Sequence, residues 1–146
     1  MRDLTPTESQ ALLVCAKAIN ADPSHLRALI EFESGWNPAA RNPISGARGL
    51  IQFMNTTARG LCYDNADQLV MLNPTSEAQL CGPIIRHFRS IALDHTTFQK
   101  LCMAVFYPAA RTWDPETEFP AIVQKQNQGI RTVKDYLAKV RRRAEA

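Results

Sequence analysis

The sequence predicts a mainly α-helical protein, and three observations support this fold class. Apolar residues recur at spacings of three and four, helix-start signals are frequent, and no stretch shows the sustained alternation of a strand. The chain has 146 residues, enough for one domain with a single core. We therefore expect one domain over residues 1–146, with at most a small hairpin that the pattern does not reveal.

The first two helices begin at capping signals. The segment Thr5-Pro6-Thr7-Glu8 offers an N-cap, a proline at the first helical position and a capping-box glutamate, and it predicts a helix to about Asn20. Asp22-Pro23 repeats the start signal and predicts a second helix to about Ser34. Residues 35–48 are rich in Gly, Pro and Asn and are predicted to form a loop.

The rest of the chain alternates helical segments with polar loops. Loops are predicted over residues 63–68 and 111–118. Helices are predicted over residues 47–54, from Asn55 or Thr56, from Thr75 or Ser76 through Phe88 with a kink at Pro83, over residues 98–106 and 122–126, and from Thr132 through Val140.

Composition is typical of a globular protein, with 45% hydrophobic and 21% charged residues. Lys and Arg number 17 against 14 Asp and Glu, and Arg141-Arg142-Arg143 accounts for much of the excess. A nucleic-acid binder would carry a basic stripe with interleaved aromatic residues, so we predict no nucleic-acid partner. We interpret the arginine cluster as a solvated last helical turn in preference to a contact with an anionic surface.

The sequence predicts neither a membrane-spanning segment nor a Sec-type signal. No apolar run approaches the ~18 residues that span a bilayer, which predicts no membrane insertion. The first ten residues, MRDLTPTESQ, place an acid and a proline where a signal sequence needs an apolar core. We therefore expect a protein made without a Sec-type signal.

The metal-ligating residue types are scattered. The cysteines lack C-x-x-C spacing, so we predict no zinc site and expect mostly buried thiols; they are Cys15, Cys62, Cys81 and Cys102. The disulfide to test first is Cys62–Cys81. A structural or surface role is expected instead of metal ligation for the three histidines, His25, His87 and His95.

One acid lies on the apolar side of the second predicted helix. At about 100° per residue, Glu33 falls within the arc of Leu26, Leu29, Ile30 and Phe32, whereas Glu31 falls opposite and should be solvated. Three roles are open to Glu33: a buried ion pair, a helix-end residue in solvent, or a functional acid. Burial would raise its pKa, and a carboxyl group protonated near neutral pH can act as a general acid.

The loop after Glu33 suggests a polar substrate. Trp36 either walls a sugar site or packs in the core, and Asn37 and Gln52 provide hydrogen-bond donors and acceptors. Gly46 and Gly49 would allow the backbone to pass close to a ligand.

Two motifs here resemble the soluble lytic transglycosylase family, a branch of the lysozyme-like superfamily. They are E-S-G-W-N-P from Glu33 and G-A-R-G-L-I-Q ending at Gln52, followed by Thr57-Ala58. The resemblance implies a lysozyme-like fold with a substrate cleft, in which Glu33 is the catalytic acid and Gln52 lines the sugar site. Further substrate-binding candidates are Ser34, Trp36, Ser45, Met54 and Tyr63.

A third family motif, A-Y-N-A-G, has its nearest counterpart in F-Y-P-A-A at residues 106–110. Tyr107 matches the tyrosine that supports the catalytic acid, and Pro108 replaces the family asparagine. The loop over residues 37–46 is one residue longer than the form common in the family. Neither Asn42 nor Ser45 can therefore be assigned to the position of the serine that usually precedes the first glycine of the second motif. The F-Y-P-A form is similar to phage-encoded members. Met54 and Phe53 either shape the cleft floor or pack in the core.

The resemblance implies a reaction on bacterial peptidoglycan that needs one carboxyl group and neither metal nor cofactor. Glu33 would protonate the bond between N-acetylmuramic acid and N-acetylglucosamine and then activate the muramoyl C6 hydroxyl, giving a 1,6-anhydro product. A hydrolytic muramidase would need a second carboxylate about 5–10 Å away. The unplaced acids that could serve are Asp64, Asp67, Glu77 and Asp94.

A second class of function is a non-catalytic glycan-binding or structural domain, for example in a phage tail. The expected setting is a monomer or a domain of a larger phage protein, in the virion or the host cytoplasm, acting on the wall in the periplasm. A holin-released endolysin fits the same observations.

Overall fold

The structure, a computed structural model, describes residues 2–146 and confirms the mainly α prediction. Within these residues β pairing is limited to isolated bridges between Arg41 and Arg48, Arg48 and Phe53, and Glu118 and Thr132. The helical elements are α1 (Pro6–Ile19), α2 (Pro23–Ser34), α3 (Asn55–Gly60), α4 (Ala66–Leu72), α5 (Ser76–Gln79), η1 (Leu80–Ile84), α6 (Ile85–Ile91), α7 (Phe98–Phe106), η2 (Pro108–Thr112), α8 (Ala121–Gln126) and α9 (Val133–Glu145).

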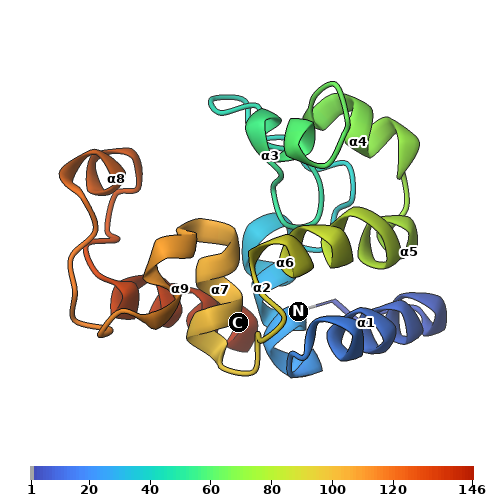
Figure 1. Cartoon of the computed structure of the whole chain (residues 1–146). Coiled ribbons are helices and arrows are strands. Elements are labelled where there is room, and N and C mark those ends of the chain that lie inside the picture. The colour runs from blue at the N-terminus through green and yellow to red at the C-terminus, as the bar shows by residue number, and fades with distance from the viewer. Residues whose placement is uncertain (1) are drawn as a thin grey trace.

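Helix α2 lies at the centre of the molecule (Figure 1). It packs against α1 on one side and against α7 and α9 on the other, and its residues Leu26, Leu29 and Ile30 are fully buried. Helices α3 and α4 contact one another beyond it, and α8 stands away from the body (Figure 1). Segments from both ends of the sequence therefore pack against α2, the helix that carries Glu33 near its C-terminal end.

The predicted helix starts are confirmed by their caps. Thr5 and Glu8 form the capping box of α1, and Asp22 accepts a hydrogen bond from the Ser24 amide at the start of α2. Thr97 caps α7 and Thr132 caps α9 through their hydroxyl groups. These signals are local in sequence, which is why they could be recognised without the fold.

Two secondary-structure predictions were wrong. Residues 47–54 form turns and not a helix, because Gly49 and Gln52 adopt positive φ angles of 85° and 58° that interrupt a right-handed helix. Part of the predicted loop over 63–68 is helical, because Asn65 accepts a hydrogen bond from the Gln68 amide and so starts α4.

The predicted kink at Pro83 takes the form of a π-helical turn, η1, between α5 and α6. A wider turn accommodates a residue that has no amide N–H to donate to the preceding turn.

Of the cysteines, Cys15 and Cys102 are buried as expected, whereas Cys62 and Cys81 are exposed; all four are free thiols, so the proposed Cys62–Cys81 bridge is not formed. Within residues 2–146, no helix combines the length and apolar character that crossing a bilayer requires.

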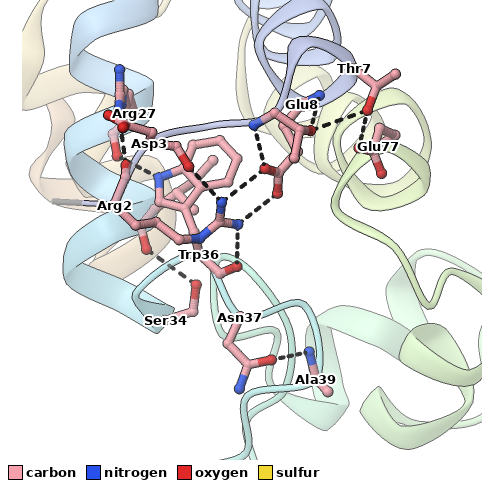
Figure 2. Close-up of polar contacts among 12 residues, drawn as sticks. Arg2, Asp3, Thr7, Glu8, Arg27, Ser34, Trp36, Asn37, Ala39 and Glu77 are labelled. Atoms are coloured by element: carbon pink, nitrogen blue, oxygen red, sulfur yellow. Dashed lines mark hydrogen bonds and ion pairs between the residues drawn. The ribbon is translucent and has the colours of Figure 1, made fainter.

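The segment before α1 is fastened to the end of α2. Both terminal nitrogens of Arg2 donate to the Glu8 carboxylate, at 2.9 and 2.7 Å, and Arg2 Nη2 also donates to the Trp36 carbonyl at 3.2 Å. Arg27 donates in turn to the Arg2 carbonyl at 3.1 Å (Figure 2). The Arg2 guanidinium lowers the pKa of Glu8 to about 2. This network holds the backbone just beyond α2 in place.

A buried amide holds the loop after α2. Gln79 is fully buried, accepts a hydrogen bond from the Leu50 amide at 2.9 Å, and donates to the Pro38 and Asn73 carbonyls at 2.8 and 3.0 Å. A Cβ atom on Gly49 would lie 2.8 Å from Gln79 Oε1. Gly49 is therefore required both for its φ angle and for the close approach of Gln79.

We expect Gly49→Ala to lower the free energy of unfolding by about 2 kcal/mol, through a strained φ and a displaced Gln79 hydrogen bond. Gly46→Ala is the matched control, because Gly46 also has a positive φ of 77° but nothing lies within 4 Å of its added Cβ. Chemical denaturation should show a smaller loss for Gly46→Ala. Equal losses in the two variants would exclude the Gln79 contact as a source of stability.

Candidate active site

Glu33 lies in the last turn of α2 and is bonded to a tyrosine from the other end of the chain. The hydroxyl group of Tyr136, on α9, donates to Glu33 Oε1 at 2.6 Å. Helix α2 ends directly afterwards, because Gly35 adopts φ 60° and its amide donates to the Glu31 carbonyl. The acid therefore sits at the carbonyl end of a helix, where the helix dipole disfavours a negative charge.

Two aromatic rings pack against Tyr136. Tyr136 is buried, Phe106 stacks on it with ring centroids 4.5 Å apart, and Phe32 meets it edge-on at 5.3 Å. Burial raises the pKa of Glu33 from 4.5 to about 7, and the hydrogen bond from Tyr136 acts in the opposite direction. The pKa of Tyr136 lies well above 10, again because of burial, so the phenol remains a donor.

A pocket of about 590 Å³ opens beside the acid. Its lining comes from the end of α2, the following loop and α9, and consists of Glu31, Phe32, Glu33, Ser34, Gly35, Ala40, Arg41, Asn42, Pro43, Ile44, Gln52 and Arg143. Glu33 keeps partial exposure at this pocket although its carboxyl group is enclosed by protein atoms.

The two carboxyl oxygens of Glu33 have different surroundings. Tyr136 occupies Oε1, whereas Oε2 has no hydrogen-bond partner among residues 2–146. A pKa near 7 means that a large fraction of Glu33 is protonated at neutral pH, with Oε2 the oxygen free to carry the proton. The arrangement can therefore deliver a proton to a bound ligand and then accept one.

The prediction that Glu31 is solvated was wrong. Only 7% of Glu31 is exposed, and its Oε1 lies 3.6 Å from Arg143 Nη2. Glu31 and Glu33 also line the same pocket, although the helical wheel placed them on opposite sides. The wheel could not show that α9 covers the Glu31 side of α2 or that the pocket surrounds the end of the helix.

The tyrosine whose hydroxyl group is bonded to Glu33 is Tyr136, whereas the sequence motif had indicated Tyr107 as the tyrosine beside the acid. Tyr107 caps the C-terminal end of α7, and its ring contacts Trp113 at 5.5 Å and Phe119 at 5.7 Å. The preceding residue, Phe106, is the one that stacks on Tyr136, so the direction of the chain at the end of α7 turns Tyr107 toward the aromatic residues of the next loop. Sequence reasoning missed Tyr136 because it lies on an apolar helix stripe without a local motif.

Of the two alternatives for Trp36, the structure supports core packing. The side chain is 1% exposed and its Nε1 donates to the Arg27 carbonyl at 3.3 Å (Figure 2). Trp36 therefore does not wall the pocket, and its backbone φ of 63° shows that the tight turn after α2 places it inward.

Gln52 and Ser34 are brought to the pocket beside Glu33. Gln52 Nε2 donates to the Gly49 carbonyl at 3.0 Å, which fixes the amide and leaves its oxygen available to a ligand. Ser34 donates to the Ile30 carbonyl at 3.2 Å, within its own helix.

The other predicted binding residues lie farther out. Ser45 is exposed on the loop and accepts a hydrogen bond from the Ala47 amide, and Met54 is partly exposed at a second pocket of about 30 Å³ that Gln52 also lines. Phe53 lines the same second pocket but is 2% exposed and packs in the core. Tyr63 lies outside both pockets, where its hydroxyl accepts a hydrogen bond from Asn73 at 3.1 Å.

The histidines lie away from the larger pocket. His87 and His95 are buried and contact the Ala104 and Phe88 carbonyls through Nε2, and His25 packs against the Phe98 ring. Residues 2–146 contain no cluster of three or more His, Cys, Asp or Glu side chains that could hold a metal ion.

Comparison with curated proteins gives partial matches. Three curated relatives, named "Probable transglycosylase SceD" from Staphylococcus aureus strains Mu3, N315 and Mu50, are each 45% identical over 53 residues. The match covers 36% of this chain and 22% of each relative, so the chain spans about a fifth of their length. No solved structure matches the chain significantly.

The family match is longer than the matches to individual relatives. Residues 12–90, more than half of the chain, match the family described as "Transglycosylase SLT domain". The matched region contains Glu33, Ser34 and Gln52 and ends before Tyr107 and Tyr136. The chain therefore belongs to the SLT transglycosylase domain family.

Proposed function

We propose that this protein is a peptidoglycan lytic transglycosylase that cleaves the β-1,4 bond between N-acetylmuramic acid and N-acetylglucosamine and leaves a 1,6-anhydro end. The observation that carries the proposal is Glu33, a pocket acid whose pKa is raised to about 7 and whose second oxygen faces no protein partner. Membership in the family, with its lysozyme-like helical fold, supports a glycan-cleaving activity.

In the proposed reaction Glu33 acts first as an acid and then as a base. Its Oε2 gives a proton to the glycosidic oxygen, which leaves with the N-acetylglucosamine unit. The resulting carboxylate accepts the proton of the muramoyl C6 hydroxyl as that oxygen bonds to C1. The carboxyl group ends the cycle protonated, and Tyr136 holds Oε1 throughout.

The positions of the other acids favour a nucleophile supplied by the substrate. None of the four candidates for a second carboxylate lines either pocket: Asp64 bonds to Gln68, Asp67 to Arg48, Glu77 to Thr7 and Asp94 to Lys100. Glu31 is the second acid of the pocket, but Arg143 is paired with it. Among the described residues of this pocket, Glu31 is therefore the remaining candidate for the water-activating base of a hydrolase, since its Oε2 has no hydrogen-bond partner.

Mass spectrometry of the fragments released from purified walls tests this reaction. We expect 1,6-anhydro ends, because the C6 hydroxyl takes the place of water. Reducing ends would instead support a hydrolytic muramidase in which Glu31 serves as the second carboxylate. An absence of clearing in a zymogram would favour a non-catalytic glycan-binding or structural domain.

We further propose that the chain acts as one domain encoded by a phage, reaching the periplasmic wall from the virion or the host cytoplasm. The F-Y-P-A segment that ends α7 supports a phage-encoded member. Gel filtration tests whether it is a monomer, and induction with and without a holin tests whether lysis needs release from the cytoplasm.

A further inference from the structure

The lining of the larger pocket includes two arginines beside its two acids, Glu31 and Glu33. Arg41 and Arg143 both line it. Arg41 is exposed, and no carboxylate of residues 2–146 lies within ion-pair distance of its guanidinium group. Arg143 is 56% exposed, and its 3.6 Å separation from Glu31 exceeds that of the other ion pairs, which span 2.6 to 3.3 Å. Both guanidinium groups therefore keep donors for a ligand.

Arg143 lines the pocket beside the C-terminal end of α2. Its Nη2 lies 3.9 Å from the place that a Cβ atom on Gly35 would occupy. The last carbonyl groups of α2 carry partial negative charge there, which favours a cation. With Glu33 protonated, the lining holds two guanidinium groups against the single carboxylate of Glu31.

The proposed substrate has anionic groups that match this excess. Its sugar rings are uncharged, whereas the peptide stems, joined through the lactyl ether of N-acetylmuramic acid, carry carboxylates. A guanidinium group binds a carboxylate through two parallel hydrogen bonds. Building on the proposed function, we propose that Arg41 and Arg143 bind stem-peptide carboxylates, and that the enzyme therefore prefers glycan that bears acidic stems.

The adjoining arginines provide a matched control. Arg141 lies over the ring of Phe98, 4.5 Å from its centroid, so it has a structural partner. Arg142 is exposed, makes no ion pair within residues 2–146 and does not line the pocket. The three arginines that the sequence presented as one solvated cluster thus have different surroundings, and Arg142→Gln removes a nearby charge without touching the pocket.

The test compares two forms of purified sacculi that lack teichoic acids, one unmodified and one with its stem carboxylates amidated by a carbodiimide and ammonia. The measured quantity is the ratio of the cleavage rates on the two forms. An exposed ion pair is weak, so we expect each arginine to raise the cleavage rate on unmodified sacculi about threefold relative to amidated sacculi. The two arginines together should give the wild type a ratio of about ten. Arg41→Gln and Arg143→Gln should each lower the ratio about threefold, and the double variant should bring it close to one. Arg142→Gln should keep the wild-type ratio.

Arg143→Gln also leaves Glu31 unpaired, so its melting temperature is measured together with its activity. Arg143→Lys retains the charge but not the paired hydrogen bonds, so it should recover only part of the ratio. Arg41→Gln tests the proposal without removing a side-chain hydrogen bond or ion pair of the described residues. Equal rates of the wild type on the two forms, or an unchanged ratio in the double variant, would overturn the proposal. If the wild type cleaves both forms equally and still leaves anhydro ends, the proposed function survives without stem recognition; if it cleaves neither, both fail.

Discussion

Glu33→Gln should lower wall-lytic activity by at least about a thousandfold, because general acid and base catalysis by one residue contributes on the order of 10²–10⁴ to the rate and Glu33 performs both steps. The amide has a similar shape and can still accept the Tyr136 hydrogen bond, but it has no proton to give. Release of soluble fragments from purified sacculi measures the loss. Undiminished release by a folded Glu33→Gln protein would remove the proposed mechanism.

The same variant should be as stable as the wild type or more stable, with a defined pH dependence. The folded-state pKa of Glu33 is about 7, against 4.5 for an unperturbed glutamate, so the folded protein binds more protons between these values. The wild-type free energy of unfolding should therefore fall as pH rises from 4.5 to 7, by on the order of 3 kcal/mol. Below about 4.5 the penalty is absent, and above about 7 it is fully present.

The melting temperature of Glu33→Gln minus that of the wild type should accordingly grow between pH 4.5 and 7 and then level off. Glu116→Gln is the control, because Glu116 is an exposed acid whose carboxylate pairs with Lys134 at the surface. An equal growth in Glu116→Gln would mean that the trend does not come from Glu33. A flat difference for Glu33→Gln would show that burial does not raise the pKa of this acid.

The sequence was informative where the structure depends on neighbouring residues. The caps of α1, α2, α7 and α9 each arise from side chains within three positions of the helix start. It was misleading over residues 47–54, because the apolar residues have helical spacing there but long-range contacts hold the segment in turns. The hydrogen bonds of Gln79 and the positive φ of Gly49 determine that loop, and both depend on a contact between residues far apart in the chain.

The candidate site likewise has one part that the sequence predicts and one part that depends on long-range packing. Glu33 could be predicted because its helix places an acid among apolar residues and its motif is compact. Tyr136 could not, because it lies 103 positions away on α9, and only the packing of α9 against α2 brings the two side chains together. Glu31 was misplaced for the same reason, since its partner Arg143 also belongs to α9. Helix α9 thus supplies both contacts to these acids, although the family match ends at residue 90.

Tyr136→Phe tests whether this distant helix controls the acid. The substitution keeps the ring that stacks on Phe106 and removes only the hydroxyl that donates to Glu33 Oε1. That hydrogen bond lowers the pKa of Glu33, so without it the pKa should rise further and the alkaline limb of the pH–rate profile should move to higher pH. A bond to a charged group is worth about 1.5–3 kcal/mol, and the bond strengthens as Glu33 loses its proton in the transition state. Activity on the plateau should therefore fall between about ten- and a hundredfold.

Tyr107→Phe is the comparison that separates the two tyrosines. Because the contacts of Tyr107 are to Trp113 and Phe119, its hydroxyl should have no influence on the ionisation of Glu33, and the alkaline limb should stay in place. Thermal melts identify any loss of fold in either variant, and a purely structural role for Tyr136 would lower activity without moving the limb. The opposite result would be an alkaline limb that moves in Tyr107→Phe and stays in place in Tyr136→Phe. It would mean that Tyr107, the tyrosine of the F-Y-P-A motif at the end of α7, influences the ionisation of Glu33 and that Tyr136 on α9 does not.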